Sequence, residues 1–406
     1  MRKRRRELGL SAQAFCPQVH DPGVTGEVDW GEAKVLLAGE PMEVGLFVMR
    51  ACFSGAGFVM AFERQTQQAF LEGHVHALEW FGGAFETIRY DNLKSAAKKV
   101  LKGRRRVESD RFVALRSHYL FASWFTLVGI EGAHEKGGVE GEVGRFRRNH
   151  LVPVPAVASL AELNVLIAAG VQRDLERRID GRPVTVDEAL AVERERLRAL
   201  PAERFETWEQ TTHRVNAKSM VVVRRNHYSV PVALVGLTVR ARVGASEVTV
   251  MHDGRDVARH PRLRGSQQRS AQLDHYLELL ARKPGALKGS LALRQQREQG
   301  AWPACFDELW AAIEQRVGAS EAARQIVDVL MLCREHDPAV VGLAVAGALA
   351  AGAHDGRAVA LLADRRQRAA SPPLQGLPER LAAVDRPPPD LSSYDELLHR
   401  EGSRDA

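Results

Sequence analysis

Cysteine is scarce in this chain: there are four, and none forms a Cys-x-x-Cys pair. This scarcity argues against a disulfide scaffold and against a cysteine-based zinc site. Long apolar runs are also missing, because the longest, at about 339–353, is rich in Ala and Gly and too short to span a bilayer. The basic run at 2–6 is not followed by an apolar segment, so we expect no signal peptide and a cytoplasmic protein.

The composition that is present is that of a soluble globular protein. Hydrophobic residues make up 45% and charged residues 27% of 406 residues, a length that predicts two or three domains. Lys and Arg number 57 against 51 Asp and Glu, which gives a net charge of +6. A positive surplus has the sign that a polyanionic partner requires, although it does not establish one.

The first part of the chain reads as a mixed α/β core over 25–158. Apolar runs at 44–50 and 57–62, separated by a Gly-rich break, predict a buried strand pair. Residues 65–81 show helical spacing and end at Gly82 and Gly83, and 85–90 resumes a strand. Further along we expect a helix at 109–120, a strand at 121–128 and a helix from about 138. Strands followed by alternating helices and strands predict an α/β layered sheet.

The remaining segments differ in character. We predict a basic lead-in at 1–24, a helical linker at 159–214, a small DNA-binding β-barrel at 215–265, a helical region at 266–365 and a Pro-containing, disordered tail at 366–406. In the helical region, Phe306, Leu309, Trp310, Ile313 and Val317 are spaced as one amphipathic stripe.

Three acidic residues occupy positions suited to metal chemistry. Asp29 is expected at the end of the first strand, Asp91 at the end of a later strand, and Glu140 at the entry to a helix. Because ligands collect at the carboxyl ends of strands in open α/β sheets, the two aspartates can converge. Two Asp and one Glu supply the oxygen ligands that Mg²⁺ prefers, and two such cations can cut or join a phosphodiester.

The helix from 138 allows a finer test. Val139, Val143 and Phe146 define its buried stripe, and Glu140 lies at the edge of that stripe, in line with Gly144 and Arg147. Glu142 points to the opposite side and is rejected as the third ligand, while Glu135 is the runner-up.

Simpler explanations exist for each of these features. A single Asp at a strand end is more often a turn or capping residue than a ligand, and a basic run such as 98–106 is usually a solvated loop. The pair His74 and His76 is a poor metal motif and is better explained by packing or surface exposure.

Three separated motifs, in order, carry a family resemblance. They are Val28-Asp29-Trp30-Gly31-Glu32, Arg89-Tyr90-Asp91-Asn92-Leu93-Lys94, and His134-Glu135-Lys136-Gly137-Gly138-Val139-Glu140 followed by Arg145-Phe146-Arg147-Arg148-Asn149. Over about residues 1–260, including 151–155, the chain resembles the IstA-type transposases of two-gene IstA/IstB bacterial insertion sequences, within the retroviral-integrase superfamily.

The resemblance implies an RNase H-like core in which Asp29, Asp91 and Glu140 form a DDE triad that binds Mg²⁺ or Mn²⁺. It implies a polynucleotidyl transferase that cleaves 3′ ends of insertion-sequence DNA and transfers them to a target, as a homo-oligomer on nucleoid DNA with an AAA+ ATPase helper. Family members usually carry a helix-turn-helix ahead of the core, and only about 24 residues precede the first motif here, so we expect an N-terminally truncated or incomplete copy. An RNase H-like nuclease without strand transfer and a non-catalytic DNA-binding remnant are the alternatives.

Basic residues near the motifs are candidates for phosphate contacts. In the core these are Lys94, Lys98, Lys136, Arg145, Arg147 and Arg148, and on the β block the weaker candidates are Arg224, Arg225, Arg240 and Arg242. His134 is equally suited to contacting DNA or to capping the helix.

Overall fold

The computed structural model describes residues 18–90, 97–100, 106–126, 139–179 and 181–370; at 97–100, 106–107, 139–140 and 369–370 it describes the backbone alone. The chain divides into two compact units, Met1–His275 and Tyr276–Ala406. Within the described ranges, no helix combines the length and the apolar character needed to cross a membrane.

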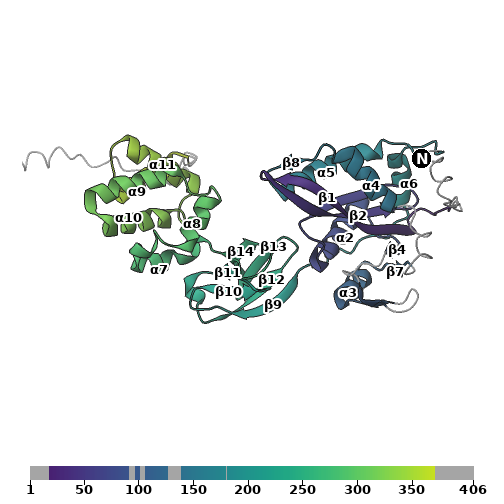
Figure 1. Ribbon diagram of the computed structural model, residues 1–406, viewed down its shortest axis with the longest axis horizontal. Helices are drawn as coiled ribbons and strands as arrows, with labels where there is room; N and C mark the ends of the chain where they lie inside the picture. Colours follow the sequence, from purple (N-terminus) through teal and green to yellow (C-terminus); the bar gives the residue numbers. More distant parts are fainter. Residues whose placement is uncertain (1–17, 91–96, 101–105, 127–138, 180, 371–406) are drawn as a thin grey trace, which may run out of the picture. The chain divides into compact units, whose positions relative to one another are not determined.

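The first unit opens with a mixed β-sheet (Figure 1). Its strands are β1 (Thr25–Leu37), β2 (Glu40–Ala51), β3 (Gly57–Phe62), β4 (Thr87–Tyr90), β7 (Ala122–Phe125) and β8 (Ala156–Val157). The order is β3-β2-β1-β4-β7, and β8 pairs with the end of β1. The first three strands are antiparallel, whereas β4 and β7 run parallel to β1. This order is that of the RNase H-like fold, and the predicted α/β core is confirmed.

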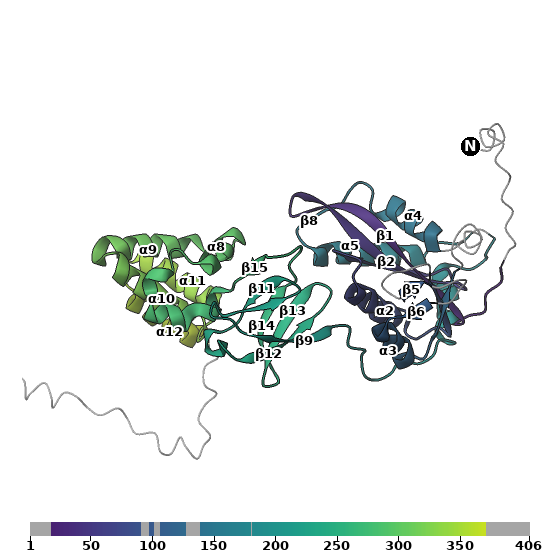
Figure 2. The same cartoon turned by 60° about the horizontal axis from the view of Figure 1, so that its bottom comes forward.

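Helices cover both faces of this sheet, with α4 and α5 on one side and α2 and α3 on the other (Figure 2). The helices of the core are α2 (Gln67–Phe81), α3 (Asp110–His118), α4 (Val139–His150), α5 (Leu160–Leu175) and α6 (Val186–Arg194). Because successive strand residues point to opposite faces, Phe47 and Met49 pack with α2 while Leu46 and Val48 pack with α4 and α5. Two apolar clusters therefore hold the sheet between its helices.

The helix predicted at 65–81 is α2 in the structure, and the residues at its two ends explain where it starts and stops. The Thr66 side chain accepts a hydrogen bond from the Ala69 backbone N–H and caps the start. Gly82 ends the helix at φ 83°, a left-handed conformation that glycine adopts without strain. The predicted inward positions, including Phe70, His74 and Leu78, are fully buried.

Two elements differ from the sequence prediction. Asp29 was expected at the end of its strand, but β1 continues to Leu37 because the chain folds back there and Leu37 pairs with Glu40 of β2. The sequence pattern predicts continuous helix from 159, but α5 ends at Leu175 and α6 starts only at Val186. Gly181 at φ 80° and the capping box of Thr185 separate the two helices.

The basic stretch after the second motif includes an antiparallel pair, β5 (Ala97–Val100) and β6 (Arg106–Glu108). Lys98 lies on β5, and its side chain is outside the described residues.

The β block of the first unit contains two small sheets around one core. The four-stranded sheet contains β9 (Glu209–Arg214), β12 (Thr238–Val243), β13 (Glu247–His252) and β14 (Arg255–Pro261), and the three-stranded sheet contains β10 (Met220–Val223), β11 (Asn226–Ser229) and β15 (Arg269–Ser270). Val221, Tyr228, Val243 and Val250 are buried between them. Strand β9 lies ahead of the block predicted from 215 and pairs with β12. Its sequence, Glu-Gln-Thr-Thr-His-Arg, contains no apolar residue, so no apolar run indicates this strand.

The second unit is helical. Its helices are α7 (Leu277–Arg282), α8 (Leu291–Glu298), α9 (Ala304–Val317), α10 (Ala319–Leu332), α11 (Pro338–Ala350) and α12 (Gly356–Ala370). The stripe predicted on α9 is buried at Phe306, Leu309, Trp310 and Ile313, whereas Val317 is exposed at the helix end. Helix α12 runs past the predicted start of the tail, because residues 365–370 are Arg, Gln and Ala, which are good helix formers. The rest of the tail lies outside the described residues.

Candidate active site

Asp29 lies within the central strand β1, beside the end of β4. In the parallel register of β1 and β4, Val28 pairs with Tyr90. Asp29 directly follows Val28 in the sequence, and Asp91 directly follows Tyr90. Val28 belongs to the cluster on the α2 face, and the residue opposite Asp29 on β2, Val48, belongs to the cluster under α4 and α5. The side chain of Asp29 therefore stands on the α4 face. It is partly buried, and its Oδ1 accepts a hydrogen bond of 2.8 Å from the Trp30 N–H.

The end of β4 is anchored inside the core by Tyr90. The ring of His74 lies between two partners: Nδ1 is 2.7 Å from the Phe70 carbonyl oxygen, and Nε2 is 2.9 Å from the Tyr90 hydroxyl. Because a carbonyl only accepts, Nδ1 carries the proton and Nε2 accepts from Tyr90. Burial lowers the pKa of His74 to about 4, so the ring is neutral at pH 7. This contact fixes the residue that precedes Asp91, which itself lies outside the described residues.

Helix α4 packs directly on the strand that carries Asp29. Val143 and Phe146 are buried against the sheet, as predicted; the side chain of Val139 is outside the described residues. A Cβ added to Gly31 would lie 2.4 Å from Cγ1 of Val143, so only glycine permits this approach. Glu140 is the second residue of α4, and its side chain lies outside the described residues.

Glu142 is buried in an ion-pair network on the β3 side of α4. Arg145 Nε donates to its Oε2 at 3.1 Å, and Arg177 Nη2 lies 3.4 Å from the same oxygen. A Cβ on Gly57 of β3 would lie 3.1 Å from Oε1 of Glu142. This carboxylate is thus committed to internal arginines.

Arg145, which we predict as a phosphate contact, is instead bound to carboxylates within the protein. Its guanidinium donates to Glu142 and, through Nη1 at 3.0 Å, to Asp174 of α5. Burial acts to lower the pKa of Arg145, but the hydrogen bonds to Asp174 and Glu142 outweigh it and raise the pKa. For Asp174, burial is likewise outweighed by the bonds from Arg145 and His150, which lower its pKa. A side chain held by two carboxylates is poorly placed to neutralise DNA, so we revise this prediction.

The next basic residues of α4 are exposed. Arg147 donates from Nη1 to the Glu32 carbonyl oxygen at 3.0 Å, and Arg148 is exposed on the following position. Both remain candidates for phosphate contacts.

A row of charged residues that the sequence motifs do not indicate lies beside Asp29. Glu27 pairs in register with Arg50 of β2 and Arg89 of β4, and each guanidinium lies 3.8 Å from one of its carboxylate oxygens. Arg89 also lies 5.3 Å from the ring centre of Trp124 on β7. Glu27 precedes Asp29 by two residues and therefore shares its face. In a strand, side chains two residues apart point to the same face, so the spacing of Glu27 and Asp29 is the sequence feature that could have predicted this row.

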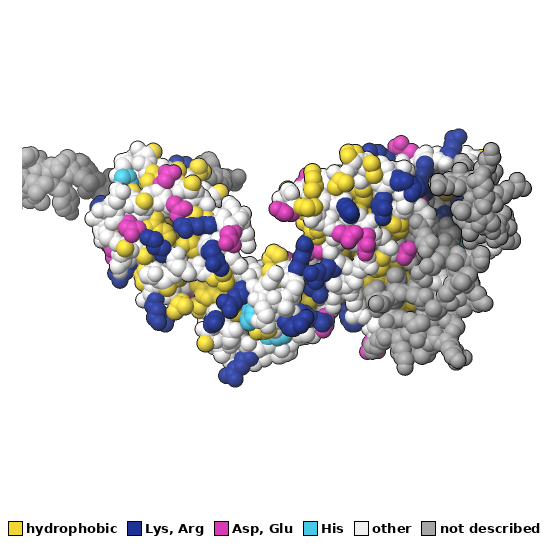
Figure 3. Space-filling view, in the orientation of Figure 1, with side chains coloured by type: hydrophobic (Ala, Val, Ile, Leu, Met, Phe, Trp, Pro, Cys, Tyr) yellow, Lys and Arg dark blue, Asp and Glu magenta, His cyan; other side chains and the backbone are white. Residues whose placement is uncertain are grey.

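Basic side chains also gather on the β block (Figure 3). The exposed ones are Arg214, Lys218, Arg224, Arg225, Arg240, Arg255, Arg259, Arg264 and Arg269. Arg224 and Arg225 form the two-residue turn between β10 and β11, with φ of 48° and 66°, and Arg224 pairs with Glu209. Arg242 is less accessible and lies 4.5 Å from the ring centre of Trp208.

The remaining predicted contacts are not described. Lys94, His134 and Lys136 lie outside the described residues, as does the runner-up Glu135. Among the side chains that are described, no group of three His, Cys, Asp or Glu residues is placed to hold a metal ion. Of the three predicted ligands, only Asp29 has a described side chain.

Comparison with known proteins identifies transposases as relatives of this chain. The family model for the Mu transposase C-terminal domain matches residues 200–272. The transposase for insertion sequences IS1326/IS1353 of Pseudomonas aeruginosa is 31% identical over 94% of this chain and 74% of its own length. A transposase of Aminobacter aminovorans is 30% identical over 98% of this chain and 78% of its own length. The IS21 transposase of Pseudomonas aeruginosa is 30% identical over 57% of this chain and 59% of its own length.

Among solved structures, the HTLV-2 integrase catalytic core domain in complex with magnesium aligns at 16% identity and a TM-score of 0.30, over 42% of this chain and 97% of that one. A likeness of this size supports no functional conclusion, and the RNase H-like assignment rests on the strand order. The sequence relatives, in contrast, span nearly the whole chain. The chain belongs to the IstA-type insertion-sequence transposases, the IS21 and IS1326/IS1353 group of the integrase superfamily.

Proposed function

We propose that this chain is a DDE transposase, a polynucleotidyl transferase that cleaves the 3′ ends of its insertion sequence and joins them to target DNA. The observation that carries the proposal is the position of Asp29. It lies on the central strand, on the face covered by the helix that carries Glu140, and one register step beyond the pair that precedes Asp91. Family membership supports the same assignment.

The donor set fits a hard divalent cation. Asp29, Asp91 and Glu140 would hold Mg²⁺ or Mn²⁺, since carboxylate oxygens are their preferred protein ligands. When bound, the cations would polarise the attacking oxygen and stabilise the leaving oxygen. The network around Glu142 commits the neighbouring carboxylate to arginines, which leaves Glu140 as the acidic residue of α4 for this role.

Neither of the two steps needs a covalent protein–DNA intermediate, and the second conserves the number of phosphodiester bonds. In the first, a water oxygen attacks the phosphorus at the element's end, the bond to the 3′-oxygen breaks, and that oxygen leaves as a 3′-hydroxyl. In the second, this hydroxyl loses its proton and attacks a target phosphorus, and the target's own 3′-oxygen departs and is protonated. One bond forms for each one broken in strand transfer, so that step needs no external energy source.

Double-stranded DNA is the partner that this chemistry requires. We assign backbone contacts to the exposed Arg147, Arg148, Arg224 and Arg225, and to Lys94, Lys98, His134 and Lys136 near the motifs. Joining two element ends calls for a homo-oligomer on DNA, and an AAA+ ATPase from the same insertion sequence is the proposed helper.

Carboxamide substitutions test the triad. We expect Asp29→Asn, Asp91→Asn and Glu140→Gln each to lower Mg²⁺-dependent cleavage of terminal-repeat DNA by about a thousandfold, because loss of metal stabilisation costs several kcal/mol in the transition state. Glu32→Gln is the matched control: Glu32 is an exposed carboxylate on the same strand as Asp29 but on its other face. Full activity of a triad variant would remove that residue from the site.

Supplying pre-cleaved ends separates the steps. Joined product from these ends supports strand transfer. Cleavage without joining would leave a nuclease, and DNA binding without Mg²⁺-dependent cleavage would leave a DNA-binding protein only.

A further inference from the structure

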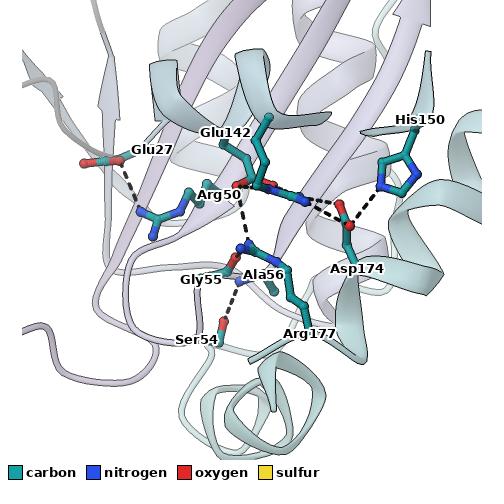
Figure 4. Close-up of polar contacts among 10 residues, drawn as sticks. Glu27, Arg50, Ser54, Gly55, Ala56, Glu142, His150, Asp174 and Arg177 are labelled. Carbon is teal, nitrogen blue, oxygen red and sulfur yellow. Dashed lines mark hydrogen bonds and ion pairs between the residues drawn. The ribbon is translucent and has the colours of Figure 1, made fainter. Parts of the chain in front are cut away.

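A network of charged and ionisable side chains ties α4 to its surroundings (Figure 4). We call it the α4 clamp; its members are Glu142, Arg145, His150, Asp174 and Arg177. Three of them lie on or at the end of α4, Asp174 is on α5, and Arg177 follows α5. The clamp therefore joins two helices that the chain connects only through residues 151–159.

Asp174 and Arg145 form the centre of the clamp. Arg145 Nη1 donates to Asp174 Oδ1 at 3.0 Å, and His150 Nε2 lies 2.8 Å from the same oxygen. Side-chain exposure is 15% for Asp174 and 8% for His150. The Asp174 carboxylate thus binds two side chains of α4, Arg145 and His150, which are five residues apart.

The other side of the clamp reaches the sheet. Arg177 Nη2 donates to the Gly55 carbonyl oxygen at 2.9 Å, in the turn before β3, and also contacts Glu142. Arg145 bridges Glu142 to Asp174. Through these contacts α4 is joined to α5 and to the β2–β3 turn at once.

Two independent contacts then fix the rotation of α4 about its own axis. Val143 packs against Gly31 of β1, while Glu142 and Arg145 are held toward β3 and α5. Because each helical residue turns the direction of the side chain by about 100°, fixing these positions also fixes the backbone direction at Glu140. A buried ion pair adds little net stability over apolar residues of equal size, so its distinctive effect is on geometry.

We propose that Arg145 and Asp174 are positioning residues for the third carboxylate of the active site. They act through α4 by holding its first turn at the height and rotation that place Glu140 beside Asp29. This inference rests on the proposed function, since it assumes that Glu140 is a ligand.

The first experiment removes the central charge. In Asp174→Asn, we expect the rate of strand transfer at saturating DNA to fall at least tenfold, the affinity for DNA to change less than twofold, and the Mg²⁺ concentration for half-maximal rate to rise severalfold. Asp174→Glu restores the charge and should recover part of the rate. Asp355→Asn is the control, because it removes a carboxylate from an ion pair with Arg316 in the second unit.

A second variant separates positioning from stability. Arg145→Met combined with Asp174→Leu replaces the charged pair by apolar side chains, and such replacements often keep or raise stability. We expect this double variant to fold, because Arg177 still pairs with Glu142, and to lose activity at temperatures where it is folded. Full activity with the wild-type Mg²⁺ dependence in this folded variant would overturn the proposal.

Two readouts without DNA chemistry complete the test. Hydrogen exchange at the amides of the first turn of α4 should be faster in both clamp variants and unchanged in Asp355→Asn. The rise in unfolding temperature that Mg²⁺ produces in the wild type should shrink in the clamp variants. Glu140→Gln is assayed in parallel: if it is active, Glu140 is not a ligand and the premise of this inference fails, whereas an inactive Glu140→Gln beside fully active clamp variants refutes the positioning role alone.

Discussion

Gly31 of β1 and Val143 of α4 are in contact so close that a single added methyl group would have no room. The distance from an ideal Cβ on Gly31 to Cγ1 of Val143 is 2.4 Å. This contact sets the separation between the strand that bears Asp29 and the helix that bears Glu140. The spacing of the two proposed ligands therefore depends on a residue that has no side chain.

Gly31→Ala should push α4 away from β1. We expect a loss of about 1–3 kcal/mol in the free energy of unfolding from overpacking, together with a fall in cleavage of at least tenfold at temperatures where the variant is folded. Val143→Ala in the same chain should restore much of the activity. The measurements are urea unfolding and cleavage of terminal-repeat DNA.

Gly73→Ala provides the control for that experiment. A Cβ there would lie 2.5 Å from Cγ of Phe47, on the α2 face of the sheet. We expect a similar loss of stability without a comparable loss of activity in the folded fraction. Equal losses of activity in both variants would show that α4 spacing is not the cause.

Arg147→Ala and Arg148→Ala should weaken DNA binding in a salt-dependent manner. Each exposed cation that neutralises a phosphate contributes about one unit to the slope of log affinity against log salt concentration, so each variant should lower that slope by about one. Arg294→Ala is the control, because Arg294 is an exposed arginine in the second unit. Unchanged affinity and slope would show that this part of α4 does not lie on DNA.

Replacing Arg224 and Arg225 should make the protein more stable and weaken its binding to DNA. Both residues have positive φ, the sign that a type I′ turn needs and that Asn-Gly adopts most readily. Replacing the pair by Asn-Gly should raise the free energy of unfolding by about 1 kcal/mol, because bulky L-residues are strained there. DNA affinity should fall at the same time. Higher stability with unchanged DNA affinity, measured by fluorescence anisotropy, would exclude a DNA contact at this turn.

His74 should make the core sensitive to acid. Its pKa in the folded chain is about 4, below the ordinary 6.5, so between these values the unfolded chain binds a proton that the folded chain does not. The contribution of His74 to the free energy of unfolding is therefore present in full above pH 6.5 and declines toward pH 4. The total loss from this group is about 3 kcal/mol. His74→Gln should be less stable at pH 7 but should lose less on acidification. Identical pH profiles in urea unfolding would contradict this assignment.

The local pattern of the sequence was enough to predict much of the core. The apolar runs of β2 and β3, the helical spacing of Phe70 and Leu78, and the terminating Gly82 are local signals, and they specified the α/β class. The inward stripe of α4 at Val143 and Phe146 was likewise readable, because a helix repeats every 3.6 residues.

The three motifs, in contrast, depended on the family resemblance. Each proposed ligand by itself had a common structural explanation, and no periodicity joins Asp29 to residues more than sixty positions away. The polar strand β9 was missed for a related reason: without an apolar run, its place became visible only when β12 lay beside it.

Sequence by itself determined the elements of the core, their apolar faces and the types of residue offered for chemistry, because each of these depends on neighbours within a few positions. Only the tertiary structure decided which charged residues are free to act outward. Arg145 and Arg147 are two residues apart on one helix, yet packing commits Arg145 to Asp174 of another helix and leaves Arg147 exposed. Such choices depend on which groups meet across the fold, and burial makes an unpaired charge too costly to leave there.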